Sequence, residues 1–197
     1  MKLLNSILAA SALAVCTTAA KADFQVQFLT FNAGNPTLGF VTDSDGVTPL
    51  GAGFSAQLYA GLNSGSLVAI GSPTPFVNGN QGYISAGTVT ASSGTIFGGS
   101  VGAYQLKAWD NDGGTITSYE AAVAANRKTG QSAIVGLGGT VQTGGFTFGG
   151  VPNGGGAPIT PPDVNLHPSF SVVIPEPSTI ALGILGLSGL LLRRRRE

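Results

Sequence analysis

Charged residues are scarce in this 197-residue chain, in which Lys, Arg, Asp and Glu together make up 9% of the sequence. An ordinary soluble domain has about 25% of these residues. The shortage excludes a coiled coil and a disordered acidic tail, because both depend on dense charge. The chain also has one Cys and one His, which excludes most metal and thiol chemistry. Its length allows one domain, and its 43% hydrophobic residues are enough for a core.

The formal net charge is zero, but the charges are segregated along the chain. Residues 23–174 contain three cationic side chains against seven carboxylates, a net charge of −4. The cations are Lys107, Arg127 and Lys128, and the carboxylates are Asp23, Asp43, Asp45, Asp110, Asp112, Glu120 and Asp163. An acidic domain repels nucleic acid, so no nucleic-acid partner is expected.

The first 22 residues have the pattern of a secretory signal peptide. A positive residue, Lys2, precedes a mostly apolar run over residues 3–15, and Ala20 and Ala22 form a small-x-small cleavage pattern. We therefore expect the mature chain to begin at Asp23, without any cysteine and stabilised by packing alone. Lipidation of Cys16 is the alternative, since residues 13–16 approach a lipobox apart from the bulky Val15.

The C-terminal end combines three features in a fixed order. Pro175, Glu176 and Pro177 precede an apolar run over residues 178–192, and Arg193, Arg194, Arg195 and Arg196 follow it. As a helix the run is about 22 Å long, which is short of the ~30 Å hydrocarbon core of a bilayer. The prolines prevent its extension on one side, and the arginines fix its orientation with the tail in the cytoplasm.

This arrangement resembles the PEP-CTERM sorting signal of Gram-negative bacteria, with Ile174 where the family usually has Val. The resemblance implies that an exosortase, a membrane-embedded cysteine protease or transpeptidase, removes the tail after transient insertion into the inner membrane. It also implies a final location at the cell surface or outside the cell, with exopolysaccharide as a further partner. An ordinary tail anchor is the alternative. Residues 56–61, 106–110 and 118–122 are similar to a set of small PEP-CTERM proteins without an assigned activity.

Between the two ends, residues 23–173 are predicted to form one mainly β domain. Alternation of apolar and polar residues predicts strands over residues 24–31, 54–60 and 104–109. Residues 140–148 predict another strand or a bulged one, and residues 169–174 a last strand. The pattern favours an antiparallel β-sandwich of jelly-roll or immunoglobulin type. One short helix is predicted after Thr117, with Thr117 and Glu120 as a capping box and a stop at Gly130. The sorting signal, residues 174–197, adds a hydrophobic helix.

Three groups of residues could carry chemistry. Residues 98–102 match the G-x-S-x-G pattern of a nucleophile elbow around Ser100, for which His167 is the only base. The turns at residues 43–46 and 110–113 offer oxygen ligands that suit calcium, but also suit ordinary turns. Asp110, Asp112 and Glu120 lie near Trp109, an arrangement that could act on or bind a sugar.

Each group also has a structural explanation, so we expect no catalytic residue, no metal and no cofactor. The sequence therefore predicts an exported, non-enzymatic surface or matrix protein. The alternative is a secreted carbohydrate-binding or carbohydrate-active domain with calcium-stabilised loops.

Overall fold

The computed structural model describes residues 23–174 except for residues 36, 80 and 93–94. The predicted signal peptide and its cleavage residues Ala20 and Ala22 lie outside the described residues, as do the sorting residues 175–197. The described residues confirm the mainly β class, with one short α-helix, α2 (Tyr119–Ala124). The strands are β1 (Asp23–Leu29), β2 (Val41–Thr42), β3 (Phe54–Gly61), β4 (Val68–Pro75), β5 (Ser85–Ser92), β6 (Val101–Asp110), β7 (Thr129–Gln131), β8 (Val135–Gly136), β9 (Phe146–Thr147) and β10 (Phe170–Ser171).

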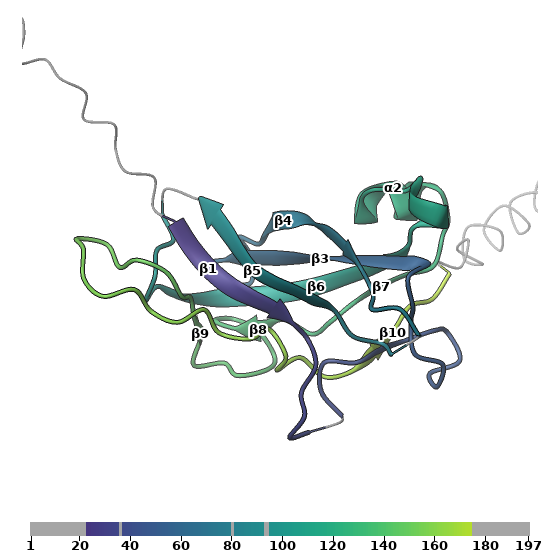
Figure 1. Ribbon diagram of the computed structural model, residues 1–197, viewed down its shortest axis with the longest axis horizontal. Helices are drawn as coiled ribbons and strands as arrows, with labels where there is room; N and C mark the ends of the chain where they lie inside the picture. The colour runs from purple at the N-terminus through teal and green to yellow at the C-terminus, as the bar shows by residue number, and fades with distance from the viewer. Residues whose placement is uncertain (1–22, 36, 80, 93–94, 175–197) are drawn as a thin grey trace, which may run out of the picture.

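The largest sheet has six strands and is built around the antiparallel pair β3 and β6 (Figure 1). Their register places Leu58 opposite Leu106 and Ala60 opposite Tyr104, and all four side chains are buried in the core. β4 pairs with the other edge of β3, while β7, β8 and β9 pair with β6. The period-two alternation of β3 and β6 therefore gives the sheet one apolar face.

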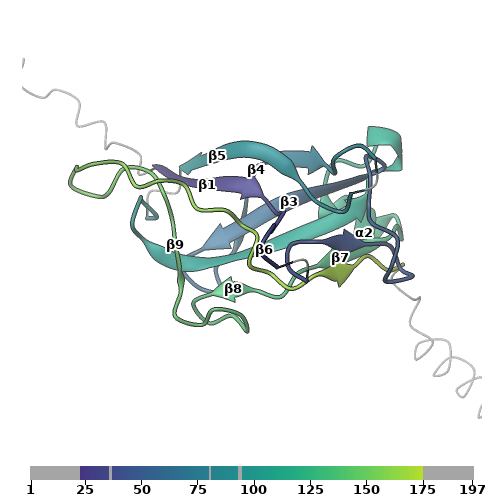
Figure 2. The same ribbon diagram turned by 60° about the horizontal axis from the view of Figure 1, so that its bottom comes forward.

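A second, two-stranded sheet of β1 and β5 lies over the larger one (Figure 2). β1 contributes Phe24, Val26 and Phe28 to the core, at 0–1% exposure each. The edge of β1 away from β5 is covered by residues 149–163, a loop rich in glycine and proline. Gln25 N–H donates to Gly149 at 2.9 Å, and Gln27 N–H donates to the carbonyl of Pro162 at 2.8 Å.

A third pair, β2 and β10, is parallel. It is an exception to the antiparallel pairing that the sequence predicts. β10 is also shorter than the predicted strand over residues 169–174. The strand predicted over residues 140–148 is reduced to β9, because Gln142 and Gly145 have positive φ angles of 48° and 103° and form a turn. By contrast, the strands predicted near β1, β3 and β6 are confirmed.

The helix begins one residue later than the capping box predicts. The N-cap is Ser118, whose Oγ accepts a hydrogen bond from the N–H of Ala121 at 3.1 Å. The prediction that Thr117 and Glu120 cap the helix is therefore wrong. The helix ends at Ala124, and the predicted stop Gly130 lies within β7. No helix within the described ranges is long and apolar enough to span a membrane.

Candidate functional site

The carboxylates near Trp109 lie on the outer face of the large sheet, away from the core. Tyr59, Lys107 and Trp109 all project from β3 or β6 on the face opposite to the buried residues Leu58 and Leu106. Residues 111–128, which include α2, cover this face beside β6 and β7 (Figure 1). We call residues 111–128 the cover segment.

Trp109 is completely buried between β6 and the cover segment. Its exposed fraction is 0%, and its indole Nε1–H donates to the carbonyl of Ile116 at 3.0 Å. A ring that stacks on a sugar must be open to solvent. The idea that Trp109 forms a sugar platform is therefore wrong, and the ring instead fixes the cover segment to the sheet.

Asp110 and Asp112 are both held within the turn that leaves β6. The Asp110 carboxylate accepts a hydrogen bond from the N–H of Asp112 at 2.9 Å. Arg127 binds from the far end of the cover segment, 2.6 Å from Asp112 Oδ2 and 3.8 Å from Asp110 Oδ2. Asn111 between them donates to the carbonyl of Ala52 and to Ser55 Oγ, each at 3.0 Å. The turn is thus closed by the chain's own groups.

Glu120 connects α2 to the sheet instead of capping the helix. Its carboxylate accepts a hydrogen bond from the hydroxyl of Tyr59 at 3.0 Å and lies 3.8 Å from the Lys107 ammonium. The same ammonium lies 4.0 Å above the ring of Tyr59 and 5.0 Å from the ring centre of Tyr119. Burial, together with the bond to Glu120, raises the pKa of Tyr59 to about 12. At neutral pH Tyr59 is therefore a hydrogen-bond donor and not a base.

In the turn at residues 43–46, both carboxylates are bound by other groups of the same domain. Lys128 Nζ contacts both carboxylate oxygens of Asp43, at 2.6 and 2.8 Å, and this contact lowers the pKa of Asp43. Asp45 accepts hydrogen bonds from the Thr48 hydroxyl and from the N–H groups of Thr48 and Val47, which lower its pKa to about 2. No group of three or more His, Cys, Asp and Glu side chains suitable for a metal ion occurs among the described residues.

Ser100 and His167 do not form a nucleophile and base pair. The Ser100 hydroxyl accepts a hydrogen bond from the N–H of Phe97 at 3.0 Å, within a turn. His167 is 0% exposed, with its Nδ1 3.1 Å from the carbonyl of Pro168 and its ring 5.8 Å from that of Phe170. Its Nε2 is buried without a hydrogen-bond partner. Burial lowers the pKa of His167 to about 4, so the ring is neutral at pH 7.

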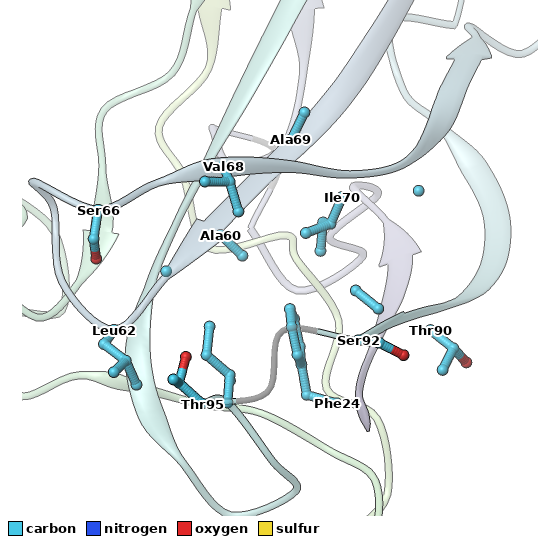
Figure 3. A pocket seen from close by; sticks show the side chains of 14 residues that line it. Phe24, Ala60, Leu62, Ser66, Val68, Ala69, Ile70, Thr90, Ser92 and Thr95 are labelled. Carbon is cyan, nitrogen blue, oxygen red and sulfur yellow. The ribbon is translucent and has the colours of Figure 1, made fainter. Parts of the chain in front are cut away.

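A cavity of about 450 Å³ lies at one end of the domain, between β4 and the β1–β5 sheet (Figure 3). Phe24 and Ala60 contribute to its floor, and Val68 and Ile70 point into it from β4. Its lining contains apolar, Gly, Ser and Thr residues and no charged side chain. The sequence did not indicate this cavity, because β4 and β5 were not predicted as strands.

Comparisons with family models, with curated proteins and with solved structures find no match to this chain.

The roles of the carboxylates lead to a first prediction. Glu120→Gln should change the unfolding free energy by no more than about 1 kcal/mol, because the amide oxygen still accepts from Tyr59 and an exposed ion pair contributes little. Asp112→Asn should cost a similar amount, because it weakens the exposed contact with Arg127. Melting temperatures of both variants and the wild type should not respond to millimolar calcium. A rise of several degrees in the wild type that is lost in Asp112→Asn would contradict this assignment and favour a calcium-stabilised binding module.

Proposed function

We propose that this chain is an exported, non-enzymatic protein of the cell surface or extracellular matrix, which an exosortase processes through its C-terminal tail. The observation that carries the proposal is the order of the tail: Pro175, Glu176 and Pro177, a short apolar run, and then four arginines. A leader with a cleavage pattern at Ala20 and Ala22 stands at the other end of the chain. On this proposal the chain passes through the inner membrane transiently, and exopolysaccharide is a candidate neighbour at its destination.

The contacts of the domain support a structural role for its polar groups. Lys107, Arg127 and Lys128 are all engaged in ion pairs with carboxylates of the same domain. Glu120 binds Tyr59 of β3, Asp110 and Asp112 bind Arg127, and Asp43 binds Lys128. These side chains therefore have stabilising partners without any substrate. The buried Trp109 removes the main support for the carbohydrate-binding alternative.

For the finer fold we propose a β-sandwich related to the jelly roll. The support is that two sheets enclose one apolar core, to which β1, β3 and β6 all contribute. Short strands joined by turns rich in Gly, Asn and Asp are typical of such domains.

The processing step can be tested by the intact mass of the mature protein isolated from its host. We expect a chain that begins at Asp23 and lacks Arg193 to Arg196. A matched variant with Pro175, Glu176 and Pro177 replaced by Ala should keep its arginines and remain with the membranes. A wild-type mature species that retains the four arginines, in a host with an active exosortase, would refute the proposal.

A further inference from the structure

β4 and β5 are neighbours that belong to different sheets, and each is paired on one side only. β4 pairs with β3, and β5 pairs with β1. The two strands touch where Gly71 of β4 meets Val89 of β5. A Cβ atom at Gly71 would lie 2.7 Å from Val89 Cγ1, so glycine permits this close approach. From there the strands separate toward Val68 and Ser92, and the gap opens onto the 450 Å³ cavity (Figure 3). We call this gap the β4–β5 seam.

The seam presents unpaired backbone groups along both of its edges. The outer edge of a strand leaves about half of its N–H and C=O groups without a partner in the sheet. Within the described residues, Val68–Ile70 and Thr90–Ser92 have backbone partners only in their own sheets. The seam ends at Gly71. The carbonyl of Gly71 already accepts a hydrogen bond from Gln57 Nε2 at 2.8 Å.

The protection found at the edge of β1 does not occur along the seam, as far as the described residues extend. The free edge of β1 is covered by backbone bonds to Gly149 and Pro162. Proteins usually protect exposed edges with Lys, other charges or Pro. β5 has none of these residues, and β4 has only Pro73 and Pro75, at the end away from the cavity. An edge left open in this way is suited to pair with a strand from another molecule.

The chemistry of the lining restricts what such a strand can carry. None of the residues that line the cavity is charged. The Asp23 carboxylate accepts a hydrogen bond from the Ser92 hydroxyl at the end of β5, outside the lining itself. A charged side chain placed inside the cavity would lose its hydration, which is unfavourable. Val68 and Ile70 point toward Phe24 in the cavity, while Ala69 lies on the other side of β4 (Figure 3). An incoming strand would therefore direct small apolar side chains inward at every second residue.

We propose that the β4–β5 seam binds an extended, uncharged peptide segment of another chain. About three residues of that segment, spanning roughly 10 Å, would lie between Val68–Ile70 and Thr90–Ser92. Their backbone would form hydrogen bonds with both edges, and one or two small or β-branched side chains would enter the cavity and occupy part of it. A fatty acyl chain or a neutral sugar could occupy the cavity, but neither would satisfy both rows of backbone groups. This proposal is independent of the processing of the tail.

The probe is a fluorescently labelled peptide with the sequence of β5, Ser-Ala-Gly-Thr-Val-Thr-Ala-Ser. This sequence has the required alternation and pairs with β1 beside the same cavity. The protein that begins at Asp23 is titrated with this peptide, and binding is measured by fluorescence anisotropy. A second titration uses a control peptide that is N-methylated at its central residues. Because N-methylation removes the donors and leaves the side chains, we expect about tenfold weaker binding of the control. Equal binding of the two peptides, or no binding of either, would overturn the proposal.

A pair of matched variants locates the site. Val68 is 58% exposed at the mouth of the seam, and Val47 is 78% exposed in a distant turn. Val68→Lys should weaken peptide binding about tenfold, and Val47→Lys should leave it unchanged. NMR signals of the amides of Val68–Ile70 and Thr90–Ser92 should shift on binding. Unchanged affinity in Val68→Lys, or shifts confined to another face, would overturn the proposal. If decanoate displaces the labelled peptide but the unlabelled peptide does not, the cavity is a lipid site, and the proposal is overturned.

Discussion

Acidification from pH 7 to pH 4 should lower the unfolding free energy of the domain by about 3 kcal/mol, through its single histidine. His167 has a pKa of about 4 in the folded domain, against an ordinary value of 6.5, because burial disfavours its charged form. Between these two values the unfolded chain binds a proton that the folded domain does not. Stability is therefore fully present above pH 6.5 and is lost as the pH falls toward 4.

Denaturant unfolding at several pH values measures this effect. The chain has one His. The pKa values of Asp43 and Asp45 are lowered, so these carboxylates change the unfolding free energy below the range of pH 4 to 6.5 in which His167 does. The phenol of Tyr104, which accepts a bond from Leu166 beside His167, has its pKa raised by burial and does not titrate there. His167→Leu should unfold with nearly constant free energy from pH 6.5 to 4.5. A wild-type profile that is flat over that range would contradict the prediction.

Trp109→Ala should destabilise the domain by about 3–5 kcal/mol, the usual cost of emptying a fully buried aromatic site. The substitution also leaves the carbonyl of Ile116 without its donor and loosens the cover segment. For a domain of this size the melting temperature should fall by about 10 °C. Emission from Trp109, the only tryptophan, should be blue-shifted and protected from acrylamide in the folded wild type.

Val47→Ala is the matched control for Trp109→Ala, because Val47 is 78% exposed and its truncation should leave the melting temperature nearly unchanged. A sugar-binding tryptophan would behave in the opposite way. Its removal would preserve the melting temperature and abolish binding to polysaccharide. An unchanged melting temperature in Trp109→Ala would therefore restore the carbohydrate-binding alternative.

The strands that build the core could be predicted from the sequence, whereas those at the open edge could not. β1, β3 and β6 each bury one face, and this burial imposes the alternation that identifies a strand. β4 and β5 are largely exposed, so no alternation of hydrophobicity is required of them. β4 also contains Gly71, Pro73 and Pro75, which are unfavourable in the interior of a strand. The cavity was missed for the same reason, because it lies between these two strands.

The local roles of the carboxylates were predicted with partial success. Turn chemistry at Asp110 and Asp112 is a property of neighbouring residues and could be inferred from their spacing. The role of Glu120 depends on Tyr59, which lies 61 residues earlier in the chain, and no local pattern contains that information. The N-cap of α2 is Ser118 and not the predicted Thr117, because Ser118 adopts the extended backbone that an N-cap needs.

The parallel pairing of β2 with β10 also determines when the domain can finish folding. The Thr42 and Ser171 hydroxyls, 129 residues apart, lie 2.8 Å from each other, so almost the whole domain separates two strands that must meet. Pairings this distant close slowly, because a long loop must be ordered before the contact forms. On the proposal of export, a chain that leaves the cell from its N-terminus would hold β2 outside while β10 was still inside. Completion of the fold would then coincide with the arrival of Phe170 and Ser171, shortly before the Pro-Glu-Pro segment.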